Sequence, residues 1–372
     1  MVIVAIDSFK GSLSSVEACE IVGKAFVDST DEVVTVPIAD GGEGTAEAFY
    51  RALGGSWVYK EVTGPDFVKR EAGFLILPDG TGVIEMAQAS GITLVKELDP
   101  LNTTTYGTGE LILGALDAGC RRLIVGIGGS ATNDGGVGMA VALGARFYDS
   151  CMNSIVPTGG GLSELIGMDL SLMDSRLKDA EVIVACDVTS VFYGPDGASV
   201  VYGPQKGADD TTVKLLDGNL KRLAELVEVG TGINLQGISG SGAAGGLGGG
   251  LVAFAGGRLG SGIDLLLDVV GFGDLVKGAD LVITGEGCFD VQSLSGKVVS
   301  GITKVAGVYG VPVIVLAGSV LVGRDVYLKA GITAAFSTVT KPCTLEEAMG
   351  DVRESLFELA SSIAELWKLR HL

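Results

Sequence analysis

Carboxylates beside glycine, each following a run of apolar residues, are the side chains best placed to do chemistry in this sequence. The clearest loop lies in "IVGIGGSATNDGGVGMAVALG" (124–144), where nine small or polar residues separate two apolar runs. The only histidine is His371, next to the last residue, which argues against a Ser-His-Asp triad, a histidine-ligated zinc site and a histidine base. Acid–base chemistry then falls to carboxylates. The candidates are Asp7, Asp40, Glu43, Asp134, Asp187, Glu286 and Asp290.

The glycines of these loops suit a phosphate group, because a glycine-rich loop before a helix presents free backbone N–H groups and the positive end of a helix dipole. The frame D-G-G-x-G-x-A occurs at 40–46 and again at 134–140. Carboxylates would repel phosphate unless a divalent cation lay between them, so the loops predict a Mg²⁺–nucleotide site. A tight turn without a ligand is the alternative. The other candidates are Gly41, Gly42, Gly44, Gly128, Gly129, Ser130 and Asn133, with Lys10, Lys206 and Lys297 beside glycine.

A dinucleotide-binding oxidoreductase is the competing interpretation. The pattern G-x-G-x-x-A at 126–131 fits the fingerprint after a strand, and Asp149 lies near the expected downstream position. However, Asp134 stands where the pyrophosphate would lie, and the helix begins late. A second match at 240–245 follows no convincing strand, and the P-loop pattern G-x-x-x-x-G-K-[ST] is absent.

Elements that would position these residues alternate along the chain as strand, loop and helix. The strand-like runs span 2–7, 33–40, 124–127, 181–187, 280–287 and 312–319. Such β-branched runs are typical of parallel strands covered on both faces, and ligands bind beyond the carboxyl ends of these strands. We therefore expect five strand ends to converge on the candidate carboxylates.

Local signals punctuate this pattern. Ser14-x-x-Glu17 and Thr344-x-x-Glu347 are capping boxes, the second beginning a helix that runs to about residue 369. The segment 56–85 breaks the alternation and predicts a hairpin that turns at 78–80. The predicted fold is α/β with two domains: a Rossmann-like parallel-sheet domain formed by residues 1–65 and 275–372, and a mixed α/β domain, 66–274, inserted between them.

Composition narrows the function class. The net charge of −19 argues against nucleic acid and anionic membranes as partners, and no apolar stretch reaches 18 residues without glycine or charge. Glycine, at 59 of 372 residues, is about twice its usual share of ~7%. Six cysteines without CxxC spacing, and an N-terminal apolar run too short for a signal peptide, predict a reduced, cytoplasmic protein.

Long motifs resemble the type I glycerate kinase family over nearly the whole chain. They are "DSFKGSLS" (7–14), "ADGGEGT" (39–45), "TTTYGTGELI" (103–112), "GIGGSATNDGG" (126–136), "CDVT" (186–189), "GPQKGA" (203–208), "AAGGLG" (243–248) and "ITGEG" (283–287). The resemblance implies a two-domain kinase with an interdomain active site that uses ATP and Mg²⁺ to phosphorylate D-glycerate. It favours 2-phosphoglycerate as product, within glyoxylate and glycerate catabolism. The sequence departs from the family pattern at Cys288 (commonly Arg), Ser295 (commonly His) and Ser190 (commonly Asn).

Roles can be assigned from these residues. Asp187 follows an apolar strand, so partial desolvation should raise its pKa; we predict it as the base, with Asp290 next and Lys297 beside them as catalytic residues. The predicted metal ligands are Asp40, Glu43, Asp134 and Glu286. The predicted substrate- and phosphate-binding residues are Asp7, Lys10, Gly41, Gly42, Gly44, Gly128, Gly129, Ser130, Asn133, Lys206 and Gln292. Alternatives are a kinase forming 3-phosphoglycerate or acting on a related hydroxy acid, an NAD-dependent dehydrogenase, and a non-catalytic sugar-acid sensor. The predicted partners are small molecules, and a homodimer is possible.

Overall fold

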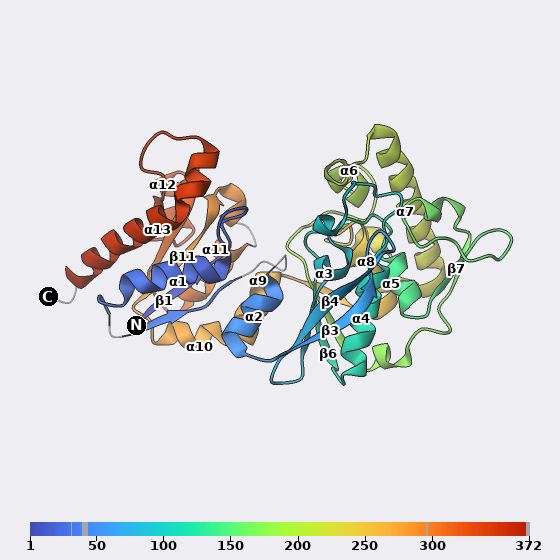
Figure 1. Cartoon of the computed structure of the whole chain (residues 1–372), viewed down its shortest axis with the longest axis horizontal. Helices are drawn as coiled ribbons and strands as arrows, with labels where there is room; N and C mark the ends of the chain where they lie inside the picture. Colours follow the sequence, from blue (N-terminus) through green and yellow to red (C-terminus); the bar gives the residue numbers. More distant parts are fainter. Residues whose placement is uncertain (31, 39–43, 295–296, 370–372) are drawn as a thin grey trace. The chain divides into compact units, whose positions relative to one another are not determined.

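The protein is described by a computed structural model that covers residues 1–30, 32–38, 44–294 and 297–369. The chain divides into two compact units (Figure 1). Unit 1 comprises Met1–Asp40, Glu47–Leu53 and Ile263–Leu372, and unit 2 comprises Gly41–Ala46 and Gly54–Gly262. Strand β3 (Ser56–Thr63), which lies inside the range 1–65 predicted for the first domain, pairs in the sheet of unit 2.

Unit 1 is built on a parallel sheet of five strands in the order β13-β12-β11-β1-β2. These strands are β1 (Val2–Ile6), β2 (Val33–Thr35), β11 (Leu281–Phe289), β12 (Val313–Val320) and β13 (Ala334–Ser337). Its helices are α1 (Ser15–Phe26), α9 (Gly262–Val269), α10 (Phe272–Lys277), α11 (Val298–Val308), α12 (Arg324–Lys329) and α13 (Leu345–Lys368). Helix α2 (Thr45–Leu53) has its first two residues in unit 2 and the others in unit 1. A turn of 3-10 helix spans Val291–Leu294.

Both faces of this sheet are covered, as the β-branched runs predict. On β12, Leu316 packs in the core with α1 and α13, whereas Val315 and Ala317 pack in the core with α11. Successive strand residues point to opposite faces, so one strand serves two cores. Helices α1 and α13 lie side by side (Figure 1). Both predicted capping boxes are confirmed, at Ser14 for α1 and at Thr344 for α13.

Unit 2 contains a mixed sheet of six strands in the order β10-β9-β6-β5-β4-β3. Its strands are β3, β4 (Lys69–Ile76), β5 (Gly82–Glu85), β6 (Arg122–Gly126), β9 (Glu181–Ala185) and β10 (Arg258–Gly260), with a separate ladder of β7 (Arg146–Tyr148) and β8 (Gly167–Asp169). Strands β5, β6, β9 and β10 are parallel, and β3–β4–β5 are antiparallel. The hairpin predicted at 78–80 is confirmed between β4 and β5, where Leu77 N–H and Thr81 C=O close the turn.

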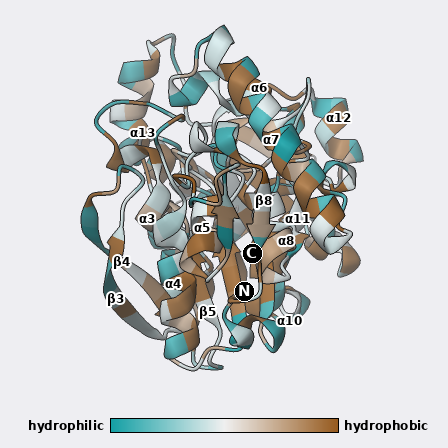
Figure 2. Cartoon of the chain, turned by 90° about the vertical axis from the view of Figure 1, so that its right-hand side faces the viewer, coloured by the Kyte–Doolittle hydropathy of each residue, from teal (hydrophilic) through white to brown (hydrophobic). Residues whose placement is uncertain are grey.

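Helices of unit 2 are α3 (Ala87–Ser90), α4 (Tyr106–Asp117), α5 (Val137–Ala142), α6 (Ala198–Tyr202), α7 (Asp210–Thr231) and α8 (Leu247–Ala255). Turns of 3-10 helix span Ile92–Leu94, Gly161–Glu164, Ser175–Lys178, Pro204–Lys206 and Leu235–Gly237. Helix α7 carries both hydrophobic and hydrophilic residues (Figure 2), and it buries Leu216, Leu220, Leu223 and Val227 along one face. No helix among the described residues is long and apolar enough to cross a membrane.

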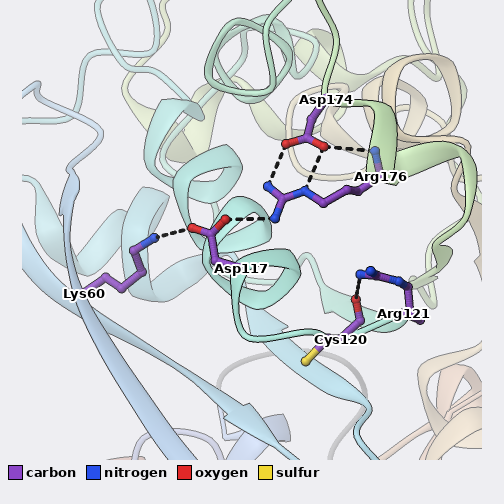
Figure 3. Close-up of polar contacts among 6 residues, drawn as sticks. All are labelled: Lys60, Asp117, Cys120, Arg121, Asp174 and Arg176. Carbon is purple, nitrogen blue, oxygen red and sulfur yellow. Dashed lines mark hydrogen bonds and ion pairs between the residues drawn. The ribbon is translucent and has the colours of Figure 1, made fainter.

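An ion-pair network ties the end of α4 to the segment before β9 (Figure 3). Arg176 forms a bidentate pair with Asp174, at 2.9 and 2.7 Å, and its remaining nitrogen lies 2.9 Å from Asp117. Lys60 on β3 approaches the other oxygen of Asp117 at 3.5 Å. The planar guanidinium suits this fork geometry, so Arg176 serves as part of the scaffold.

Candidate functional site

The predicted site residues separate by unit. Asp7, Lys10, Glu286, Asp290, Gln292 and Lys297 belong to unit 1, and Gly44, Gly128, Gly129, Ser130, Asn133, Asp134, Asp187 and Lys206 belong to unit 2. The strands whose ends carry the predicted carboxylates belong to two different sheets, one in each unit, and the predicted convergence of five strand ends stays a prediction. Asp40, Gly41, Gly42 and Glu43 lie outside the described residues, so their predicted roles stay predictions.

A pocket of about 510 Å³ opens at the carboxyl ends of β1, β11 and β12 in unit 1. One wall is charged and is formed by Asp7, Lys10, Glu286, Asp290 and Lys297. Parallel strands present their carboxyl ends to ligands in this way, and the volume lies in the range of small-molecule sites. The sequence therefore predicted five residues that do gather in one pocket.

A second part of the pocket's lining, the apolar wall, carries no charge. It is formed by Val339, which follows β13, and by Leu345, Ala348, Met349 and Val352 of α13. Val339 and Leu345 are partly or largely exposed, so they offer apolar surface that a ligand could cover. Sequence reasoning missed this wall, since nothing in the sequence of α13 relates it to the loops after β1 and β11.

Glycine keeps the strands close at the pocket. A Cβ on Gly318 of β12 would lie 2.5 Å from the carbonyl oxygen of Gly287 on β11, which no side chain tolerates. A Cβ on Gly287 would in turn stand 3.4 Å from the backbone nitrogen of Lys10. That second distance is an ordinary contact, so the close approach that requires glycine is the one between β11 and β12, where a Cβ on Gly285 of the "GEG" motif would also lie 2.0 Å from the carbonyl oxygen of Leu316.

Asp290 and Lys297 are fixed by the turn between β11 and α11. One carboxylate oxygen of Asp290 accepts from the backbone N–H groups of Gln292 and Ser293, at 2.8 and 3.2 Å. Lys297 is the N-cap residue of α11, and its amine lies 3.4 Å from the side-chain oxygen of Gln292. The lysine therefore stands at the positive end of a helix, where an anion would be stabilised.

Glu286 is the perturbed carboxylate of the pocket. Burial raises the pKa of its carboxyl above the usual range, with Asp290 acting in the same direction and Ser293, Lys297 and Lys10 acting against it. One of its oxygens is buried without a hydrogen-bond partner among the described residues. An oxygen in that state is suited to a cation or a donor from a ligand.

In unit 2, the loop between β6 and α5 is organised by Asp134. Its buried carboxylate accepts from the backbone N–H and hydroxyl of Thr105, both at 2.8 Å, and from the N–H groups of Gly136 and Gly138, at 3.0 and 3.1 Å. Three of these donors reach one carboxylate oxygen and the fourth reaches the other. This geometry does not support Asp134 as a metal ligand, because the carboxylate is fully buried and both of its oxygens are held by the protein.

The same bonds occupy the backbone N–H groups that the second D-G-G-x-G-x-A frame, at 134–140, would offer to a phosphate; the roles predicted for Gly128, Gly129 and Ser130 stay predictions. Asp134 takes the N–H groups at the start of α5, and the N–H of Gly135 donates to the carbonyl of Gly245 at 3.0 Å. The backbone of residues 245–246 packs directly on residues 132–135. The structure therefore argues against the dinucleotide fingerprint at 126–131, because a side-chain carboxylate and a second loop already engage the start of the following helix.

The threonines of "TTTYGTG" support this loop, a role that sequence reasoning did not assign. The hydroxyl of Thr103 donates to the carbonyl of Ala131 at 3.0 Å. The hydroxyl of Thr105 donates to Asp134 and accepts from the N–H of Met139 at 2.9 Å. Three consecutive threonines before a helix were the available signal, since threonine competes for backbone partners at helix starts.

Lys206 lies under the loop rather than at an open surface. It is 2% exposed, and its amine donates to the hydroxyl of Ser130 at 2.7 Å and to the carbonyl of Thr132 at 2.6 Å. Burial lowers the pKa of the Lys206 ammonium to about 7, and the charge of Asp134 opposes this shift. Ser130 is 8% exposed, so a ligand can reach Ser130 more readily than it can reach Lys206.

Asp187 and Asn133 remain at the carboxyl end of the mixed sheet. Asp187 follows β9, is half-buried, and accepts from the N–H of Gly262 at 3.0 Å. The buried amide of Asn133 donates to the hydroxyl of Ser199 at 2.9 Å, and its oxygen has no partner among the described residues. Within that part of the chain, no three His, Cys, Asp or Glu side chains gather to hold a metal ion.

A buried glutamate that sequence reasoning missed stands at the end of β5. Glu85 is 4% exposed and accepts from the N–H of Ala46, in the first turn of α2, at 2.6 Å. It thereby fixes the chain just after the D-G-G-E-G-T motif. An acid at a helix start complements the helix dipole.

The three departures from the family pattern lie in different surroundings. Cys288 is exposed and lines the pocket of unit 1. The hydroxyl of Ser190 is buried without a partner among the described residues, and Ser295 lies outside them. Cys288 is the departure that can alter ligand binding directly.

Comparison with known proteins gives a consistent result. The model of the glycerate kinase family matches residues 2–368. The chain is 46% identical to a glycerate kinase of Bacillus subtilis strain 168, covering 99% of this chain and 98% of that protein. It is 44% identical to a glycerate 2-kinase of Escherichia coli K12, covering 98% and 97%. A crystal structure from Salmonella typhimurium LT2, provisionally described as glycerate kinase 2, is 42% identical with a TM-score of 0.88, covering 100% and 98%.

Proposed function

The chain belongs to the glycerate kinase family, and from that premise we propose that it transfers the γ-phosphate of ATP to D-glycerate and releases 2-phosphoglycerate. The observation that carries the proposal is the pocket of unit 1, whose lining combines charged and apolar side chains. The name of the Escherichia coli relative supports the 2-hydroxyl as the acceptor.

ATP is the ligand that matches both walls of this pocket. We assign the nucleobase to the apolar wall at Val339, Leu345 and Met349, because aromatic bases are buried favourably against such side chains. The phosphates fit near Lys10 and Lys297, with Lys297 at the start of α11. Phosphoryl transfer depends mainly on such positioning and charge neutralisation.

The pocket also fits Mg²⁺. This ion usually takes one or two protein carboxylates and completes its shell with water and phosphate oxygens. Glu286, with its unpartnered buried oxygen, and Asp7 on the same wall are the residues that would hold it. When bound, the ion would neutralise charge on the transferred phosphoryl group.

For the acceptor, we propose that Asp187 takes the proton of the reacting hydroxyl. The O–H bond breaks toward the carboxylate as oxygen bonds to phosphorus, and the bond from phosphorus to the ADP oxygen breaks. The half-buried position of Asp187 and its bond from Gly262 N–H support a fixed base. Asp290, one oxygen of which accepts from two backbone N–H groups of its own turn, is the second candidate. We propose that Ser130 binds the acid substrate.

The reaction is tested by incubating the protein with Mg-ATP and D-glycerate and resolving the products by ³¹P NMR. We expect glycerate-dependent ADP formation and the resonance of 2-phosphoglycerate. Formation of 3-phosphoglycerate would contradict the proposed acceptor and show that the 3-hydroxyl is phosphorylated instead. Glycerate binding without ATP consumption would support a sensor instead. The cytoplasmic location, the place in glyoxylate and glycerate catabolism and the homodimeric state of this protein stay predictions.

A further inference from the structure

A buried lysine, a serine hydroxyl and a buried carboxylate are linked through one loop of unit 2. The amine of Lys206 reaches Ser130 and the carbonyl of Thr132, while Asp134, two residues further on, holds Thr105 and the start of α5. Neither Lys206 nor Asp134 is exposed enough to serve as a substrate contact, at 2% and 0%. Their chemistry must therefore act through a neighbour.

Ser130 is that neighbour. When the amine of Lys206 is protonated, it can only donate, so the hydroxyl oxygen of Ser130 accepts and its hydrogen must turn elsewhere. Hydrogen bonds within the described residues give that hydroxyl no second partner. A neutral amine could instead accept the hydroxyl hydrogen. The charge of Lys206 thus decides whether Ser130 can donate to an anionic ligand.

We propose that Asp134 is a positioning residue that works through Lys206: it fixes the loop that carries Ser130 and supplies the negative charge that keeps Lys206 protonated, so that the Ser130 hydroxyl donates to the carboxylate of the acid substrate. This inference rests on the proposed function. Burial raises the pKa of the Asp134 carboxyl, and the hydrogen bonds from Thr105, Gly136 and Gly138 act against this shift and favour the charged form. Asp134 has two separable tasks, one geometric and one electrostatic. Its four donors hold α4 and α5 at their starts, and its charge is the one that acts on Lys206 among the described residues.

The electrostatic task predicts that the pH profile of kcat/KM for glycerate has a descending limb, a pH range in which activity falls as the pH rises. Because burial lowers the pKa of Lys206 to about 7, kcat/KM for glycerate should fall as the pH rises through that region and the lysine loses its proton. Removal of a nearby opposite charge moves a pKa by roughly 1–3 units. In Asp134→Asn the pKa of Lys206 should fall further, so the limb should move to lower pH by about one unit or more.

Two further variants separate geometry from charge. Thr105→Val removes a donor to Asp134 but keeps its charge, so kcat/KM should fall without movement of the limb. Lys206→Met should abolish the limb and raise KM for glycerate by ~10-fold or more while KM for ATP stays within threefold. The matched control is Thr108→Val, since Thr108 is also buried in α4 but bonds to Ser90 instead of Asp134.

The decisive readout is a lysine NMR titration of the side-chain nitrogen of Lys206 in the wild type and in Asp134→Asn, which needs no turnover. A titration midpoint unchanged by Asp134→Asn overturns the inference, as does a limb that persists in Lys206→Met. If Asp134→Asn does not fold, the Lys206→Met profile decides. A wild type that consumes no ATP with glycerate at any pH would defeat the proposed function, whereas the titration still tests the coupling of Asp134 to Lys206.

Discussion

At the scale of single residues, the pocket of unit 1 sets two lysines against three carboxylates, and the two kinds of side chain should respond differently to substitution. Lys297 combines its own charge with the start of α11. We expect Lys297→Ala to lower kcat/KM by ~100-fold, about 2.7 kcal/mol of transition-state stabilisation, because no other group replaces a charge at that position. Steady-state kinetics with varied ATP measures this.

The matched control for Lys297 is Lys304→Ala, on the same helix but exposed and outside the pocket. It should change kcat/KM by less than threefold. If Lys297→Ala behaved like the control, Lys297 would be an ordinary surface lysine.

Glu286 should show opposite effects on activity and stability. Burial raises the pKa of its carboxyl, so the folded protein keeps this proton over a pH window in which the unfolded chain has lost it. The free energy of unfolding therefore decreases as the pH rises from 4.5, the ordinary pKa of a glutamate, to the raised pKa of Glu286 in the folded protein. Glu286→Gln removes this loss and should be more stable than the wild type at pH 7.5, yet lower kcat/KM by ~10-fold or more.

Urea unfolding at pH 4.5 and 7.5 measures the first effect, and kinetics at varied Mg²⁺ measures the second. Glu354→Gln, an exposed glutamate of α13, is the control and should stay within about 0.5 kcal/mol. If Glu286→Gln changed the free energy of unfolding by the same amount at both pH values, the predicted cost of burying the ionised Glu286 carboxylate would be wrong.

At the scale of elements, glycine decides where a helix can approach a strand. A Cβ on Gly107 of α4 would lie 2.0 Å from the carbonyl oxygen of Thr63 on β3. Gly107→Ala should therefore push α4 from β3 and lower the free energy of unfolding by ~1–3 kcal/mol. Gly218 in α7 has open space around it, and Gly218→Ala should stabilise by up to ~1 kcal/mol through helix propensity.

Urea unfolding followed by circular dichroism distinguishes the two glycine variants. A gain of similar size in both would show that helix propensity, rather than close contact with Thr63, governs the change. The pair also probes the motif "TTTYGTGELI", because Gly107 stands next to the threonines that support the loop of Asp134.

At the scale of the whole molecule, each unit has its own hydrophobic core. The core of unit 2 draws on residues 58 to 259, and the cores of unit 1 draw on both ends of the chain. We expect calorimetry to resolve two transitions. ATP at 100 times its Kd should raise the free energy of unfolding of unit 1 by about 2.7 kcal/mol. Gly107→Ala should lower the unfolding temperature of unit 2 alone. A single transition whose calorimetric and van't Hoff enthalpies agree for the whole chain would contradict this.

The local structure was largely readable from the residues themselves. The capping boxes at Ser14 and Thr344, the hairpin between β4 and β5 and the parallel β-branched strands all appear as predicted. These features depend on residues close in sequence, whose hydrogen bonds and side-chain periodicity act over a few positions. The motifs also predicted the family, which the comparisons confirm.

The roles of individual residues depended on partners far along the chain. Asp134 was predicted as a metal ligand, but the structure places Thr105 and two backbone N–H groups around it. Lys206 was predicted to bind substrate or phosphate, but the structure buries its amine against Ser130 and Thr132. The sequence by itself determined which residues can carry charge and which segments form strands and helices. Only the tertiary structure decided which charges are satisfied internally, because the free energy of a carboxylate or ammonium depends on its burial and on donors and acceptors supplied by distant segments.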